Sequence, residues 1–191
     1  ILNGDLEGSG TIDDPYLICD VCALQNMSGN LSAHYALNNS INASNTSMWN
    51  SGAGFVPVGN FTSPFTGSLD GRGYNISELL INRSATDYVG LFGAIGSSGS
   101  ILNARLVNVS TTGKVSTGGL VGSNSGTVNN SYSSGNVSGG NGNNVGGLVG
   151  YNVGNISNSS SATTVSGGAS YNCFGGLAGR NWQTITNSCA A

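Results

Sequence analysis

A four-residue motif, Gly-Leu-x-Gly, recurs four times in the second half of the chain at an almost constant interval. Its leucines are Leu91, Leu120, Leu148 and Leu177, so the intervals are 29, 28 and 29 residues. The residues eight positions after the last three leucines are also apolar: Val128, Ile156 and Ile185. Repeats of this length indicate that the chain stacks several copies of one supersecondary unit.

Each copy holds short segments rich in β-branched residues, such as Thr163-Thr164-Val165, separated by Gly, Asn and Ser. Such segments favour strands, the separators favour turns, and no segment shows the 3.6-residue period of an amphipathic helix. We therefore expect an all-β parallel β-solenoid with 28–29 residues and about three short strands per coil, each coil burying its inner face against its neighbours. The four leucines should form one inward column, and the apolar residues eight positions later a second.

The composition fits such a stack. Gly, Asn, Ser and Thr make up 100 of the 191 residues, and only 7% are charged. A disordered linker could share this composition, but 38% hydrophobic residues in register and only three prolines argue against it. Glycines beside each leucine are expected to adopt positive φ at the corners and to allow close stacking, and Asn and Ser to form ladders between coils.

The charges exclude several classes of partner. All eight carboxylates lie in the first 87 residues, which carry a net charge of −6, whereas the remaining residues carry +3. A nucleic-acid-binding protein would show a basic stripe, and this chain has none. No apolar run approaches the roughly 18 residues that span a bilayer, so no membrane insertion is expected. The opening residues lack the basic and apolar regions of a signal peptide, so a secreted form would begin at a processing site.

The four Gly-Leu-x-Gly copies resemble the GLUG motif of bacterial immunoglobulin A peptidases and filamentous-haemagglutinin-like surface proteins. Three earlier segments resemble what precedes those repeats: GTIDDPYLI at 10–18, HYAL at 34–37 and FTGSLDGRGYNI at 65–76. The resemblance runs from about Gly8 to Ala191. It implies a right-handed parallel β-helix on a secreted or cell-surface protein. It does not imply proteolysis, because these modules accompany the peptidase domains and are not their catalytic part.

Three regions are expected. Residues 1–10 form an N-terminal extension and a possible donated strand. Residues 11–87 form a cap and the first irregular coils. Residues 88–191 form four GLUG-type coils, of which the last is incomplete, since the chain continues for only 14 residues beyond Leu177.

N-glycosylation sequons, Asn-x-Ser/Thr, are frequent. They begin at Asn26, Asn30, Asn38, Asn42, Asn45, Asn60, Asn75, Asn82, Asn108, Asn129, Asn136, Asn155 and Asn158. From 26 Asn and 42 Ser or Thr, about six would arise by chance. Passive generation from Asn-rich turns and Ser-rich strands remains open, but the two-fold excess favours real glycosylation, above all in the first half. Asn129 and Asn158 are nearly one period apart, so we expect incomplete occupancy there.

The cysteines form two pairs at opposite ends of the chain, Cys19 with Cys22 and Cys173 with Cys189. A zinc site would need further ligands, and His34 is the only histidine. A thioredoxin-like motif would need a βαβ context that the pattern lacks. We therefore expect structural disulfides, within one end or between subunits, in an oxidising compartment, with buried thiols as the alternative.

No catalytic, metal or cofactor site is expected. A polysaccharide lyase or hydrolase needs paired carboxylates or a calcium site, and the repeat coils contain no Asp or Glu. Asp70-Gly71-Arg72-Gly73 is interpreted as a turn, and His34 as a residue packed beside Tyr35. No serine has a plausible His and Asp partner set.

The sequence thus predicts a non-enzymatic, extracellular, N-glycosylated structural protein. Its expected partner is itself, in a head-to-tail filament, sheath or coat in which residues 1–6 add a strand to the unfinished last coil of a neighbour. A fragment of a longer solenoid is the competing interpretation of that unfinished coil. An adhesin or carbohydrate-binding module is the alternative function, and exposed aromatic residues on one face of the coils would favour it.

Overall fold

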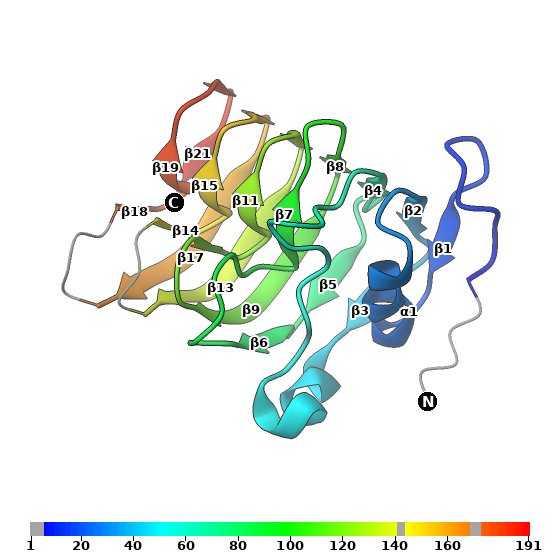
Figure 1. The fold of residues 1–191 in the computed structure, drawn as a ribbon, viewed down its shortest axis with the longest axis horizontal. Coiled ribbons are helices and arrows are strands. Elements are labelled where there is room, and N and C mark those ends of the chain that lie inside the picture. The colour runs from blue at the N-terminus through cyan, green and yellow to red at the C-terminus, as the bar shows by residue number, and fades with distance from the viewer. Residues whose placement is uncertain (1–5, 141–143, 169–172) are drawn as a thin grey trace.

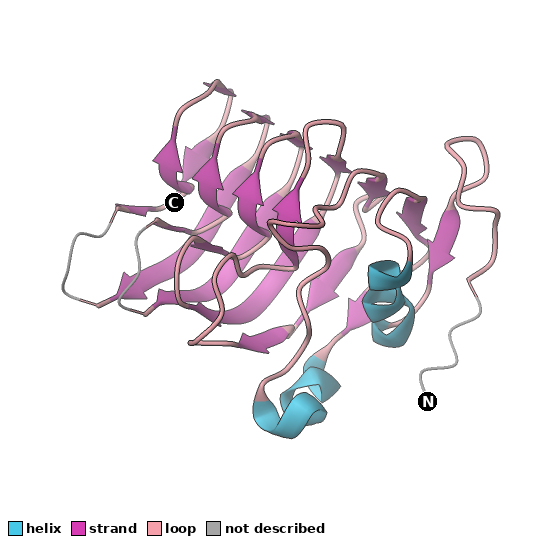
Figure 2. Ribbon diagram, in the orientation of Figure 1, coloured by secondary structure: helices cyan, strands magenta, loops and turns pink. Residues whose placement is uncertain are grey.

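In a computed structural model of the chain, residues 6–140, 144–168 and 173–191 are described. Short strands run around a narrow core and stack in parallel on the equivalent strands of the next coil (Figures 1 and 2). The predicted all-β parallel β-solenoid is confirmed. Neighbouring coils are therefore separated by the usual inter-strand distance of about 4.8 Å.

Two seven-stranded sheets form two sides of the stack. Sheet A, in spatial order, consists of β1 (Tyr16–Ile18), β2 (His34–Leu37), β4 (Ser68–Asp70), β8 (Ser100–Leu102), β12 (Thr127–Asn129), β16 (Asn155–Ser157) and β20 (Ile185–Thr186). Sheet B consists of β21 (Cys189–Ala190), β17 (Ser160–Gly167), β13 (Tyr132–Gly139), β9 (Arg105–Gly113), β5 (Asn75–Ser77) and β3 (Ile41–Asn42), with β6 (Leu80–Asn82) on the second half of β9.

Two narrower sheets complete the coils. Sheet C consists of β19 (Ala178–Asn181), β15 (Val149–Asn152), β11 (Val121–Asn124) and β7 (Phe92–Ile95). Sheet D consists of β10 (Thr117–Gly118), β14 (Val145–Gly146) and β18 (Phe174–Gly175). A regular coil thus has four strands and not the expected three, because the two residues before each Gly-Leu pair form a short strand of their own.

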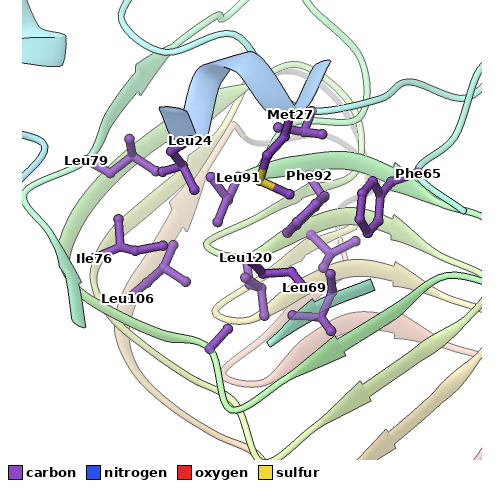
Figure 3. Close-up of a cluster of buried hydrophobic side chains, with 14 of the residues drawn as sticks. Leu24, Met27, Phe65, Leu69, Ile76, Leu79, Leu91, Phe92, Leu106 and Leu120 are labelled. Carbon is purple, nitrogen blue, oxygen red and sulfur yellow. The ribbon is translucent and has the colours of Figure 1, made fainter. Parts of the chain in front are cut away.

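The predicted inward columns are present. Leu91, Leu120 and Leu148 are fully buried and Leu177 is 8% exposed. The amide of Leu120 donates to the carbonyl of Leu148 (3.0 Å), and that of Leu148 to the carbonyl of Leu177 (2.9 Å). In sheet A, Ile101, Val128, Ile156 and Ile185 pair in register. Figure 3 shows Leu91 and Leu120 in the same cluster as Leu69 and Phe92.

The glycines beside the leucines serve close packing and not positive φ. A Cβ on Gly147 would collide with the carbonyl oxygen of Gly176 and the hydroxyl of Ser161. None of these flanking glycines is among the described residues with positive φ. The left-handed corners between sheets A and B are instead occupied by asparagines: Asn103, Asn130, Asn158 and Asn187, with φ between 48° and 52°. Asparagine tolerates this region because its side chain bonds locally.

A helical cap covers the N-terminal end of the stack. It consists of α1 (Val21–Asn26) and the 3₁₀ turn η1 (Met27–Gly29). The carboxylate of Asp20 caps α1 by accepting the amide of Ala23 (2.7 Å). A six-residue helix is unstable alone, so α1 depends on burying Leu24, which Figure 3 shows with Met27 over the core. A second 3₁₀ segment, η2 (Ser44–Gly52), is interrupted by non-helical dihedrals at Trp49, Asn50 and Ser51.

The C-terminal end of the described stack differs from the capped end. β18, β19, β20 and β21 are each the last strand of their sheet and pair on one side only. Ile185 is half-buried, whereas Ile156, its partner on the preceding coil, is buried. Trp182, also in the last coil, is 62% exposed. Within the described residues, α1 therefore covers the apolar column at one end, and β18 to β21 are the last strands at the other.

Candidate functional site

The asparagines of the thirteen sequons all reach the surface. Eleven are exposed, Asn26 and Asn129 are half-buried, and none is buried. Every sequon asparagine lies within the described residues. No strand of sheets C and D holds any of them; they lie in α1, in η2, in strands of sheets A and B, and in loops, among them the 58–65 loop that bridges to β7 on both sides of Asn60.

Four sequons follow directly from strand geometry. In Asn75-Ile76-Ser77, Asn108-Val109-Ser110, Asn136-Val137-Ser138 and Asn155-Ile156-Ser157, the asparagine is exposed and the central residue is at most 1% exposed. Because side chains alternate across a strand, Asn-apolar-Ser is the outward-inward-outward pattern of a polar solenoid surface, although Asn108 (φ 55°) lies at an irregularity in the register of β9. These sequons need no selection for glycosylation to explain them.

Three sequons have a different local structure. The side-chain Oδ1 of Asn30, Asn42 and Asn60 accepts the backbone amide two residues later, that of Ser32 (3.3 Å), Ser44 (2.9 Å) and Thr62 (3.0 Å) respectively. Such Asx turns fix the orientation of the side chain. Since the bonds use Oδ1, they do not occupy the amide nitrogen that carries the sugar in an N-glycan.

Asn129, the last residue of β12, is joined to the corner asparagine Asn158. The Asn158 amide nitrogen donates to Oδ1 of Asn129 (3.0 Å), which also accepts the hydroxyl of Ser157 (3.1 Å). Asn187 in turn donates to Oδ1 of Asn158 (3.4 Å). A sugar on Asn158 would disturb this ladder.

A second asparagine ladder joins the last residues of the sheet C strands β11, β15 and β19. Asn124 donates to Oδ1 of Asn152 (2.7 Å), and Asn152 donates to Oδ1 of Asn181 (2.7 Å). Asn152 also donates to the carbonyl of Gly154 (2.9 Å). Asn124 and Asn152 are fully buried, so these bonds satisfy amides that water cannot reach.

All four cysteines carry free thiols in this structure. Cys22 lies in α1 and is half-buried, which raises the pKa of its thiol, with the charge of Asp20 adding to that effect. Cys19, Cys173 and Cys189 are exposed. The predicted disulfides among Cys19, Cys22, Cys173 and Cys189 remain a prediction, and the buried thiol that served as the alternative does not describe the three exposed residues.

One hollow gathers several polar side chains that sequence reasoning kept apart. It lies on the outer face of β2 and β4, beside the loop that precedes β1, and has a volume of about 290 Å³. Its lining includes Asp13, His34, Ser68, Asp70 and Arg72. His34 is not merely packed beside Tyr35, because its Nδ1 lies 2.8 Å from the hydroxyl of Ser68.

The sequence could not show this convergence. His34 and Ser68 face each other because β2 and β4 pair in register, although 34 residues separate them. That interval departs from the 28–29-residue period, so the repeat could not predict the pairing. The turn at Asp70 was predicted correctly: its Oδ1 accepts the amide of Arg72 (2.8 Å) and the side chain of Asn103 (2.8 Å).

Among the described residues, no group of three or more His, Cys, Asp or Glu side chains could hold a metal ion. Over the same residues, no helix is long and apolar enough to cross a membrane. The fold and surface therefore define a parallel β-solenoid with an amide- and hydroxyl-rich exterior that carries many accessible sequons.

Comparison with known proteins gives partial relatives. No protein-family model matches the chain. Halomucin of Haloquadratum walsbyi is 42% identical over 138 residues, which are 69% of this chain and 2% of halomucin. A candidate Gly-rich membrane protein of Evansella cellulosilytica is 36% identical over 98 residues, 50% of this chain and 11% of that protein. The chain thus spans only a small part of the length of either relative.

One solved structure is similar in shape. A candidate immunoglobulin A1 protease of Bacteroides ovatus matches with a TM-score of 0.47 and 19% identity, over 95% of this chain and 76% of that chain. The β-solenoid that the GLUG resemblance implied is present, while membership of the GLUG-repeat proteins stays a prediction.

Proposed function

We propose that this chain is a non-enzymatic structural module of an extracellular, cell-surface protein, and that it carries N-linked sugar. The observation behind the proposal is that all thirteen sequon asparagines reach the surface of the molecule and eleven of them are exposed. The coils from β8 onward contain no carboxylate, so their surface offers amides and hydroxyls and no acid for acid–base catalysis. The names of the two sequence relatives, halomucin and a Gly-rich membrane protein, agree with a place at the cell surface.

The sequons should differ in occupancy. Asn30, Asn42 and Asn60 lie in Asx turns with the amide nitrogen outside those bonds, so they are the favoured acceptors. Asn158 uses its amide nitrogen in the corner ladder and should be the least occupied. Mass spectrometry of peptides from the natively produced protein tests both statements. Finding only unmodified asparagine at all thirteen positions would refute the glycosylation proposal.

We also propose that modules associate head-to-tail. An added strand would contribute main-chain hydrogen bonds, and the acidic first half and basic second half favour that polarity. Residues 1–5 of the predicted donor strand lie outside the described residues. Leu6 packs against its own core and Glu7 bridges to Leu17, so donation requires that Leu6 be released or that the preceding residues suffice.

Deletion of residues 1–6 tests this association. Electron microscopy and sedimentation should show filaments for the intact chain and monomers for the deletion variant. Assembly that persists unchanged after the deletion would contradict strand donation.

A second candidate function, carbohydrate binding by the module as an adhesin, is favoured by exposed aromatic residues near sheet C. Phe61 is 65% exposed and stacks on Tyr88 with ring centroids 5.0 Å apart. Trp182 is 62% exposed beneath the guanidinium of Arg180, which lies 4.7 Å from the ring. Polysaccharide that co-sediments with the parent chain, and does so less with Trp182→Ala, would support this function over a purely structural one.

A further inference from the structure

Hydrogen bonds fix several of the polar side chains that line the hollow beside β2 and β4. His34 and Ser68 are cross-strand neighbours joined by a 2.8 Å hydrogen bond, which orients the imidazole. Asp70 is held by two hydrogen bonds to Oδ1, so its second oxygen remains as an acceptor in a fixed direction. Fixed polar groups bind with little loss of side-chain entropy, which is the advantage of preorganisation.

A further polar group of the hollow, the Asp13 carboxylate, comes from a loop that internal hydrogen bonds hold in shape. The amides of Ser9 and Gly10 both donate to the carbonyl of Asp14 (3.1 and 2.9 Å), and the amide of Asp14 donates to the hydroxyl of Thr11 (3.2 Å). Asp13 lies within this closed turn and lines the hollow. Its carboxylate is therefore presented from a turn with three internal bonds.

Charge and apolar surface restrict what the hollow can hold. Asp13 and Asp70 contribute two negative charges and Arg72 one positive charge, so an anion is disfavoured. The remaining lining includes Ile12, which is 68% exposed, with Pro15 and Leu102. The hollow thus combines two carboxylates, a guanidinium, an imidazole and a hydroxyl with a small hydrocarbon wall.

We propose that this hollow binds one neutral sugar ring. The hydroxyls of a hexopyranose would donate to Asp13 and Asp70 and accept from Arg72, while the C–H face of the ring would pack on Pro15 and Ile12. A volume of about 290 Å³ lies near the lower end of the size of ligand pockets, which suits a single ring. This site goes beyond the proposed structural role and does not depend on glycosylation of the chain itself.

His34 provides a direct test because it is the only histidine, so its ring gives a single set of NMR signals. We would titrate the unglycosylated full chain with methyl glucoside, methyl galactoside and methyl mannoside. At least one should shift the His34 ring signals saturably, with a dissociation constant in the millimolar range that is ordinary for one sugar ring. The indole signal of Trp182, on another part of the molecule, should stay in place. Glucuronate should bind more weakly than the matching neutral sugar.

Matched variants locate the binding. Asp13→Asn keeps the size of an exposed loop residue and should weaken binding by about tenfold, since it removes a charged acceptor. Asp87→Asn makes the same change at an exposed carboxylate that does not line the hollow and should leave the affinity unchanged. The proposal is overturned if none of the three sugars shifts His34 up to about 100 mM, if Asp13→Asn binds as tightly as the parent, or if glucuronate binds more tightly than glucose.

Discussion

The side chains of Asn152 and Asn181 are joined across two coils by a 2.7 Å hydrogen bond, and Asn152 accepts an equally short one from Asn124. Side-chain amides thereby extend the backbone ladder along the axis of the stack. Because Asn152 is fully buried, its amide has no access to water, and its partners depend on it.

Replacing Asn152 by alanine should therefore lower the free energy of unfolding by about 3 kcal/mol, because the side chains of Asn124 and Asn181 would each lose a hydrogen-bond partner. Asn155→Ala, at an exposed position on the next strand, is the control and should change stability by less than about 0.5 kcal/mol. Urea unfolding of the unglycosylated proteins measures both. Equal effects would mean that the ladder is not a source of stability.

Gly147→Ala should destabilise the chain by about 3 kcal/mol, because the added methyl collides with backbone and side-chain atoms of the neighbouring strands. Gly29→Ala is the matched change at a glycine whose Cβ would meet no atom within 4 Å, and it should be nearly neutral. Thermal denaturation followed by circular dichroism compares the two. A tolerated Gly147→Ala would show that the coils can separate more easily than the contacts indicate.

The raised pKa of Tyr35 predicts that the folded chain loses stability at high pH. Burial, with a smaller effect of Tyr16, raises the pKa of Tyr35 to about 12 from an ordinary value of 10.0. Between these two values the unfolded chain releases the proton before the folded chain does, so stability is complete below pH 10 and falls as the pH rises towards 12. The fall should be smaller in Tyr35→Phe, which also loses the hydrogen bond to the carbonyl of Asn30 (2.7 Å). Urea midpoints measured from pH 8 to 12 would disagree with this assignment if both proteins showed the same slope.

Removal of one whole coil should leave a folded protein. Deleting residues 120–147 joins Gly119 to Leu148, so that Leu148 takes the position of Leu120. The deletion removes 28 residues, the same shift that pairs Val121 with Val149 between neighbouring coils. The product should unfold in one transition with an m-value about 15% smaller. Deleting 124–147 instead removes four residues fewer, moves Leu148 out of phase and should prevent cooperative folding. If both deletions behaved alike, the register between coils would not control folding.

Much of the fold could be predicted because the repeat carries it. The period of Leu91, Leu120, Leu148 and Leu177 located the core columns, and Ile101 joins the second column although it follows Leu91 by ten residues and not by eight. The role of the flanking glycines was only half correct, since contact between coils requires them while Asn103 and its equivalents take the positive φ. Local propensity alone does not separate these two reasons for a small residue.

The cap and the hollow were harder to predict. α1 is six residues long, too short for a periodic signal, and it exists because Leu24 and Met27 close the end of the core. The approach of His34 to Ser68 and Asp70 arises from irregular coils whose lengths no repeat fixes. Sequence reasoning could identify the His34 strand and the Asp70 turn separately, but their relative position depends on how many residues each loop takes up.

The hydrogen bonds that join the coils point along the stack, and this has a mechanical consequence. Tension applied along the stack would load those bonds one coil at a time. Each released coil of 28 residues would lengthen the chain by about 90 Å once extended. A molecule built in this way would extend under tension in discrete steps, one coil at a time, and would dissipate mechanical work at each step.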